Sequence, residues 1–250
     1  MSNLIGLFLK KLIVGKSKNL ISLDDPFARM QRLLQGQPVT GILDAGASHG
    51  RISRKLLTRF PRANVFAFEP NGLYGEVLRQ FAREEPRFHP YFIALSDEKG
   101  RARLNLTTAP GSTSLLMPNR QMRDLFSADA SVEGFTEVDV TTIDDWVQTN
   151  GNPPLQILKF DIQGAELQAL RGATRTLRAS TSLIYIELWF NPGYDGGALY
   201  GEVDSFLRTE GFVLFDIFKP KYDPRGVLTW ANAIFVSPGR VKVRPNGPAV

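Results

Sequence analysis

Short apolar runs alternate with amphipathic segments along most of the chain. The runs are typical of buried strands, and the segments, whose apolar positions recur every three or four residues, are typical of helices. Strands are expected at 41–44, 64–70, 87–95, 155–162, 183–188, 212–218 and 231–236. Helices are expected at 51–60, 71–84, 144–150, 165–177 and 201–209. This alternation predicts a Rossmann-like, doubly wound α/β domain around a mostly parallel seven-stranded sheet, which binds ligands outside the carboxyl ends of its strands.

Two further segments, 101–107 and 137–143, alternate residue by residue between apolar and polar positions. That period predicts an antiparallel addition to the sheet. The polar stretch between them, 108–134, contains no clear element, and a connection of this length in a compact domain is usually functional or disordered.

The stretch Ile42–Gly50, ILDAGASHG, reads as a strand, a tight turn and the start of a helix. Glycine lets the backbone turn tightly beside a ligand, and the helix start offers unpaired N–H groups. A dinucleotide fingerprint needs glycines at positions 1, 3 and 6, but here Gly46 and Gly50 stand at 1 and 5, with Asp44 two residues before the first. The spacing resembles motif I of class I S-adenosylmethionine (SAM) methyltransferases instead.

Acidic residues follow or end four of the expected core strands: Asp44, Glu69, Asp161 and Glu187. Each alone could be a solvated turn residue, or a helix N-terminal acid in the case of Glu69. Four at one edge of the sheet favour a binding site, in which Glu69 accepts hydrogen bonds from ribose hydroxyls. Asp161 ends the almost continuous apolar run 155–162, which is expected at the centre of the sheet. His89, at the opposite end of its strand, is expected to be structural.

The ends of the chain differ from this pattern. Residues 1–18 place Leu4, Ile5, Phe8 and Leu12 on one helical face beside four lysines, which predicts either a helix packed on the domain or one lying on a membrane surface. The apolar run is too short to span a membrane. We expect a helical segment over 1–40, one domain over 41–236, and a loose tail over 237–250, rich in Pro, Gly and charge.

The composition limits the kinds of metal site and partner that the chain can have. The chain of 250 residues has no Cys and two His, which excludes disulfides, thiolate zinc sites and a His-rich metal centre, so no metal is expected. The net charge of +5 comes without a dense run of Lys and Arg, and no nucleic-acid partner is expected. These features are compatible with a cytoplasmic protein, with contact at the inner face of a membrane as an open alternative.

Several motifs then occur in a recognisable order: DAGASHG, FAFEPN, the IALSD turn, GSTSLL, VDVTTIDDW and LKFDIQGAELQALRGA. In this order they resemble FkbM-type SAM-dependent methyltransferases over about residues 40–190. The last motif is similar to a family signature, here Lys159, Asp161, Gln163, Gly164, Glu166, Leu170 and Gly172. Ser48 departs from the family, which usually has Asn there.

The resemblance implies a class I methyltransferase fold, SAM as cofactor, and O-methylation of a hydroxyl on a sugar, a glycan or a small-molecule natural product. The expected cofactor-binding residues are Asp44, Gly46, Ala47, Ser48, Gly50, Glu69, Pro70, Asn71 and Ser96. Asp161 is the candidate catalytic base, with Glu166 second to it. An NAD-dependent oxidoreductase and a non-catalytic module of the same fold remain alternatives. The acceptor and the oligomeric state cannot be derived from the sequence.

Overall fold

The computed structural model describes residues 25–120, 122 and 131–241, and its centre is a seven-stranded sheet of order β3-β2-β1-β7-β8-β10-β9. The first five strands in this order are parallel, and β10 runs antiparallel to both of its neighbours. The strands are β1 (Gly41–Ala45), β2 (Asn64–Phe68), β3 (Phe88–Tyr91), β7 (Ile157–Phe160), β8 (Leu183–Trp189), β9 (Val213–Tyr222) and β10 (Leu228–Val236). The predicted doubly wound, mostly parallel sheet is thereby confirmed.

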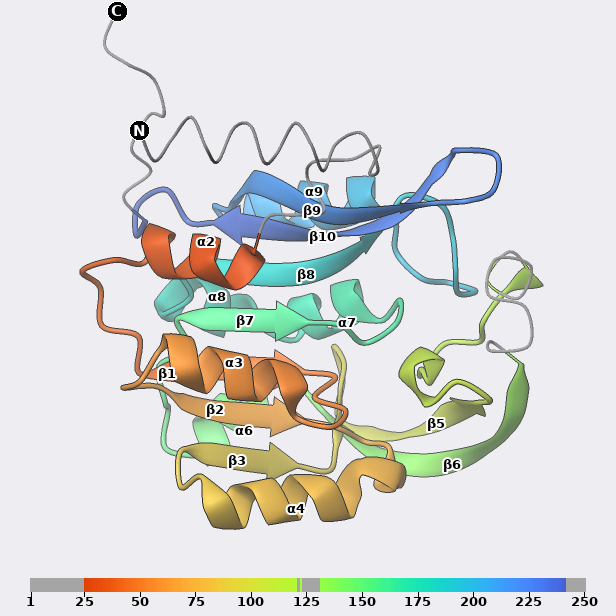
Figure 1. The fold of residues 1–250 in the computed structure, drawn as a ribbon, viewed down its shortest axis with the longest axis horizontal. Coiled ribbons are helices and arrows are strands. Elements are labelled where there is room, and N and C mark those ends of the chain that lie inside the picture. Colours follow the sequence, from red (N-terminus) through yellow and green to blue (C-terminus); the bar gives the residue numbers. More distant parts are fainter. Residues whose placement is uncertain (1–24, 121, 123–130, 242–250) are drawn as a thin grey trace, which may run out of the picture.

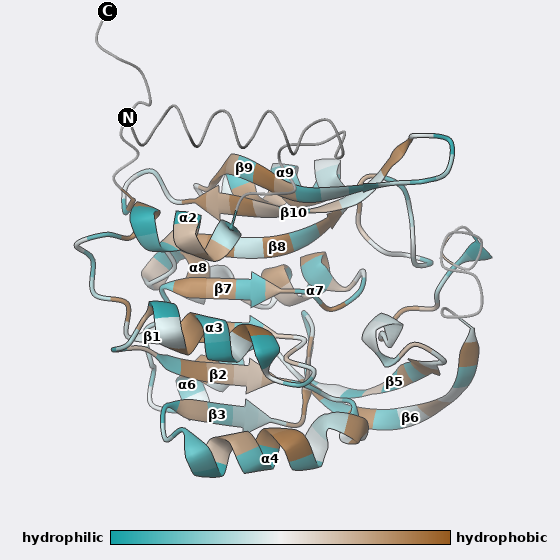
Figure 2. Cartoon of the chain, viewed as in Figure 1, coloured by the Kyte–Doolittle hydropathy of each residue, from teal (hydrophilic) through white to brown (hydrophobic). Residues whose placement is uncertain are grey.

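Helices cover both faces of this sheet (Figure 1). One face carries α2 (Pro26–Leu33), α3 (Arg51–Arg59) and α4 (Gly75–Glu84), and the other carries α6 (Ile143–Thr149), α7 (Glu166–Arg171), α8 (Thr174–Ala179) and α9 (Tyr200–Thr209). All residues of β1, β7 and β8 are buried, as expected for strands covered on both faces. Figure 2 shows apolar residues along these strands and polar ones on the outer turns of α3 and α4.

A second, three-stranded sheet stands at the carboxyl edge of the first, with the order β4-β6-β5. It consists of β4 (Ala94–Leu95), β5 (Gly100–Thr107) and β6 (Val132–Thr141). The predicted antiparallel addition is confirmed as the β5–β6 pair, but it does not extend the main sheet. The single strand predicted over 87–95 is wrong, because the chain leaves the main sheet after Tyr91 and Ala94 packs into the core of the small sheet.

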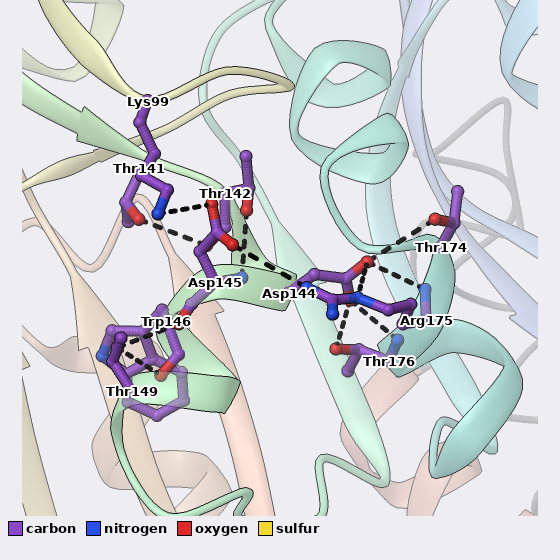
Figure 3. Close-up of polar contacts among 10 residues, drawn as sticks. All are labelled: Lys99, Thr141, Thr142, Asp144, Asp145, Trp146, Thr149, Thr174, Arg175 and Thr176. Carbon is purple, nitrogen blue, oxygen red and sulfur yellow. Dashed lines mark hydrogen bonds and ion pairs between the residues drawn. The ribbon is translucent and has the colours of Figure 1, made fainter.

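The helix predicted over 165–177 is also divided, at Gly172, where the chain packs closely against the 94–96 segment. A Cβ there would lie 2.2 Å from the Ser96 carbonyl oxygen, and the Gly172 carbonyl accepts the backbone N–H of Asp144 instead. The Asp144 carboxylate then accepts the backbone N–H groups of Arg175 and Thr176, which begins α8 as a separate helix (Figure 3). The acidic pair of the VDVTTIDDW motif is therefore structural.

The remaining differences concern the ends of elements. Strands β6, β9 and β10 are longer than predicted. Because β6 begins at Val132, the polar stretch after β5 ends at Ser131 instead of residue 134. This stretch includes a short 3-10 helix, η3 (Pro110–Ser112). Of the helical segment predicted over 1–40, the described part contains α2, which Asp25 caps by accepting the Phe27 N–H. The amphipathic segment 1–18 and most of the tail lie outside the described residues.

Candidate functional site

A cavity of about 500 Å³ lies where β1, β2 and β7 end, between the main sheet and the small sheet. Its floor is formed by the turn after β1, the residues that follow β2, and the end of β7. Its roof is formed by Leu104 and by residues between 110 and 115, and its side by 93–95. The size is that of a small-molecule site, and the position is the one that the alternating pattern predicts.

The turn after β1 approaches the end of β7 more closely than a side chain would allow. Gly46 has φ +74°, and a Cβ on it would lie 1.9 Å from the carbonyl oxygen of Asp161. Ser48 also has a left-handed backbone, with φ +49°, which is uncommon for a residue other than glycine. Ala47 and Ser48 line the cavity beside Gly46, whereas Gly50 does not.

Lys159 fixes this turn from below, a role that the sequence did not reveal. Its ammonium donates to the carbonyl oxygens of Ala45 at 2.9 Å and Gly46 at 2.8 Å, and forms an ion pair with Asp44 at 2.8 Å. Burial alone would lower the pKa of Lys159, but the charges of Asp44 and Asp161 offset that cost, so the pKa is raised and the side chain is a cation. The sequence does carry one sign of this role, because a lysine inside an apolar strand needs a partner for its charge.

Asp44 supports the turn rather than facing the cavity. Its side chain is fully buried, bound to Lys159 and to the hydroxyl of Ser53, which donates at 2.6 Å. It is absent from the cavity wall. The prediction that Asp44 contacts the cofactor directly is therefore not supported, because Asp44 instead supports the backbone of Ala45 and Gly46 through Lys159.

Glu69 lies in the cavity wall at the end of β2, as does Pro70. Its two carboxylate oxygens accept the backbone N–H groups of Ser48 at 2.8 Å and Asn71 at 2.9 Å. Burial raises the pKa of Glu69, and these two hydrogen bonds limit the rise. A carboxylate oxygen can accept more than one hydrogen bond, so Glu69 keeps acceptor capacity for hydroxyl groups in the cavity.

Asp161 lies in the cavity wall directly after β7, and Gln163 lies beside it. The Gln163 amide nitrogen donates to Asp161 at 2.8 Å and to Glu187 at 3.1 Å. Glu187 is buried in β8 behind this pair and does not line the cavity. Burial, together with the nearby charges of Asp161 and Glu166, raises the pKa of Glu187 well above its ordinary value.

Besides Asp44 and Gly50, three more of the predicted site residues do not line the cavity. Glu166 is buried, and its carboxylate holds the turn before α7 by accepting the N–H groups of Ile162 and Gly164, both at 2.9 Å. Asn71 caps the 3-10 helix η2 (Gly72–Tyr74). Ser96 pairs with Thr141 of the small sheet and donates its hydroxyl to Asp97. The predictions of direct contact are corrected for all three, because their polar atoms are used within the fold.

His89 is placed as expected, in β3 with its ring nitrogen 2.9 Å from the Asn64 side chain, and burial lowers its pKa. Within the described ranges, no group of three or more His, Asp and Glu side chains could hold a metal ion. The charged residues of the cavity wall are two carboxylates, Glu69 and Asp161, and two cations, Lys159 and Arg51, beside a glycine turn of close approach. Such a wall fits a ligand that carries both hydroxyl groups and a positive charge, as SAM does.

The chain matches the family described as Methyltransferase FkbM domain over residues 44–214. It is 27% identical to the 2-O-methyltransferase NoeI of Sinorhizobium fredii over 167 residues, which cover 64% of this chain and 68% of that protein. It is 24% identical to the methyltransferase sdnD of Sordaria araneosa over 193 residues, which cover 68% of this chain and 73% of that protein.

Among solved structures, the methyltransferase FkbM of Methylobacillus flagellatus KT is similar, with a TM-score of 0.51 and 16% identity. The match covers 82% of this chain and 45% of that protein, so the chain spans less than half of its length. This likeness shows the fold.

Proposed function

The chain belongs to the FkbM methyltransferase family, and we propose that this SAM-dependent enzyme methylates a hydroxyl oxygen on a small-molecule or glycan acceptor. Family membership replaces the NAD-dependent alternative, which the glycine spacing already disfavoured. O-methylation is supported by the relative named a 2-O-methyltransferase. The observation that carries the proposal is the pair of carboxylates, Glu69 and Asp161, on two walls of one cavity beside the glycine turn.

SAM supplies an electrophilic methyl group on a positively charged sulfur. In this proposal the turn at Gly46–Ser48 holds the amino-acid end of the cofactor, and Glu69 accepts hydrogen bonds from its ribose hydroxyls. The Asp44–Lys159 pair keeps the turn in place, with Lys159 in the cavity wall and Asp44 behind it. Fixed geometry of this kind can supply about 7–11 kcal/mol toward a displacement between two bound reactants.

Asp161 is proposed as the general base that removes the acceptor's hydroxyl proton. Its carboxylate reaches the cavity at the end of the central strand, between the cofactor turn and the roof. Glu166 and Glu187 are less suited to this role, because neither lines the cavity. A base placed in this way contributes about 10²–10⁴-fold to the rate.

The test is Asp161→Asn, after mass spectrometry of extracts incubated with labelled SAM has identified an acceptor. The amide keeps the shape but cannot take the proton, so kcat should fall about 10²-fold or more while SAM affinity is largely kept. Asp139→Asn on β6 is the matched control, because that side chain is 76% exposed and does not line the cavity. Chemistry near the wild-type rate in single turnovers would remove Asp161 from proton transfer.

The acceptor is proposed to bind under the roof residues 110–115, which line the cavity and belong to a long connection outside the main sheet. A peripheral membrane contact through residues 1–18 and a cytoplasmic location stay predictions. No helix in the described part of the chain is long and apolar enough to cross a bilayer. Flotation of the full chain with anionic liposomes, compared with a chain lacking residues 1–18, tests the contact.

A further inference from the structure

Gln163 has an unusual number of specific contacts for a residue in a turn. Besides its two donations, to Asp161 and Glu187, its side-chain oxygen accepts the hydroxyl of Tyr194 at 2.8 Å. Its backbone carbonyl accepts the hydroxyl of Ser114 at 2.7 Å. Both amide protons and the carbonyl of the carboxamide are therefore used within the protein, so the side chain is held rather than free to bind a ligand.

The partners of Gln163 come from four separate parts of the fold. Asp161 follows β7, Glu187 belongs to β8, Ser114 belongs to the cavity roof, and Tyr194 belongs to the loop after β8. Tyr194 is almost fully buried, and its ring leaves no room for a side chain on Gly164, where a Cβ would lie 3.0 Å from it. Gln163 thus joins the floor of the cavity to its roof and to the loop after β8.

The roof and the loop after β8 are also attached to each other. The Asn119 N–H donates to the Gly193 carbonyl at 3.0 Å, and the Asp195 N–H donates to the Met117 carbonyl at 2.9 Å. The Tyr194 hydroxyl also lies 3.0 Å from the Ser112 carbonyl oxygen. These contacts make one connected layer above the cavity, and the Gln163 side chain connects that layer to Asp161.

The backbone of Gln163 is left-handed, with φ +59°. This conformation is unfavourable for a residue with a side chain and persists only where the surroundings determine it. Here the four contacts hold it in place, and Gly164, with φ +97°, completes the turn. A conformation maintained at this cost beside a cavity is the kind found where a side chain must be aimed.

We propose that Gln163 is a positioning residue for methyl transfer, which aims the Asp161 carboxylate at the acceptor by joining it to Glu187 and to the layer above the cavity. This inference rests on the proposed function of Asp161 as the base. A carboxylate on a rotatable side chain loses rate when it is misplaced, because proton removal needs hydrogen-bond distance to the hydroxyl. The amide also separates two acids that would otherwise face each other.

Other charged and titratable groups lie near Asp161, and they must be the same in the wild type and in the variants that are compared. Lys159 lies two residues before it, Glu166 and Glu187 lie behind it, and the hydroxyls of Tyr185 and Tyr194 feel its charge. None of these changes in a variant at position 163. A change in the pH dependence of kcat in such a variant would therefore originate in the side chain that replaces Gln163.

Two variants distinguish a role in orienting the Asp161 carboxylate from a role in holding only the roof and the loop after β8. Gln163→Glu keeps an oxygen that can accept the Tyr194 hydroxyl but cannot donate to Asp161, while Gln163→Met removes both functions at similar size. We expect kcat to fall about 10- to 100-fold in both, with the KM for SAM within about twofold of wild type. In Gln163→Glu the acidic limb of the kcat profile should move to higher pH, because a further carboxylate has been added beside Asp161 and Glu187.

The matched control is Gln156→Met, because Gln156 directly precedes β7 and so lies at the opposite end of that strand from Gln163. Its side-chain oxygen accepts the N–H groups of Thr40 and Gly41, far from the cavity, so its loss should lower the melting temperature and leave kcat unchanged. Comparing the melting temperatures of the Gln163 variants with that of this control shows how much of any loss in kcat comes from destabilisation of the fold. If Gln163→Glu retains wild-type kcat, position 163 only anchors the layer and the inference is overturned.

A double variant links the inference to Asp161. If Gln163 acts through Asp161, then Gln163→Met should cost almost nothing further in an Asp161→Asn background. Equal losses in the two backgrounds would overturn the positioning role while leaving the base assignment intact. If Asp161→Asn itself keeps the wild-type rate, the proposed function of Asp161 has failed, and the inference with it.

Discussion

Replacing Lys159 with Met should be one of the most destabilising single changes available in this protein. The side chain is 2% exposed, and its ammonium holds a carboxylate that is fully buried. Met matches the length of the stem and adds no polar group. It leaves Asp44 as a buried charge with a single hydrogen bond, from Ser53, and leaves the carbonyls of Ala45 and Gly46 without their cation.

The expected loss follows from these contacts. Removing one partner of a buried ion pair costs about 3–5 kcal/mol, because the other charge remains in a medium that solvates it poorly. With a urea slope of about 3 kcal/mol/M, the unfolding midpoint should fall by roughly 1–1.7 M. SAM affinity should fall as well, because the carbonyls that Lys159 holds belong to the cofactor turn.

Urea denaturation followed by tryptophan fluorescence measures this loss, and two further variants show its cause. Lys99→Met removes an exposed ion pair with Asp145 and should leave the midpoint unchanged. Asp44→Asn combined with Lys159→Met removes the orphaned charge and should recover part of the loss. A Lys159→Met midpoint equal to wild type, or a double variant less stable than the single one, would refute the reasoning.

Two further predictions concern the carboxylates. Glu69→Ala should weaken SAM binding about 10- to 100-fold by calorimetry, since a hydrogen bond to a charged group contributes about 1.5–3 kcal/mol; equal affinity would remove Glu69 from the site. Burial raises the pKa of Glu166 to about 7, against 4.5 for the ordinary side chain, so the folded state keeps a proton that the unfolded state releases. That stabilisation is complete below pH 4.5 and is lost as the pH rises through about 7. The free energy of unfolding of Glu166→Gln should therefore depend less on pH in this range. An unchanged slope would contradict the raised pKa of Glu166.

The sequence predicts the main sheet well because each central strand is a nearly unbroken apolar run, and burial on both faces leaves no other arrangement for such runs. The edge that carries the acids follows from the parallel direction of those strands. Which acid points into the cavity does not follow. Asp44 and Glu166 are as close in sequence to the glycines as Glu69 and Asp161 are, and only the position of Lys159 and the turn at Gln163 decide which carboxylates are used internally.

The breaks in regular elements were harder to foresee for a related reason. Nothing local to 87–95 prevents one strand, and nothing local to 165–177 prevents one helix apart from Gly172. Both break because distant partners compete for the same backbone groups: β6 for residues 94–95, and Asp144 for the start of α8. Contacts between residues far apart in sequence leave no periodic signal, so periodicity cannot report them.

The antiparallel pairing of β5 with β6 has a consequence for how acceptor choice can change. The connection between these strands leaves the small sheet at Thr107 and re-enters it at Val132, and those two residues are paired directly. A segment whose two ends are fixed side by side can lengthen cheaply, since each doubling of loop length costs only about 0.6 kcal/mol in closure entropy. Evolution, or a protein engineer, can therefore exchange this connection to admit a different acceptor while the cofactor turn and Asp161, carried by other strands, stay in register.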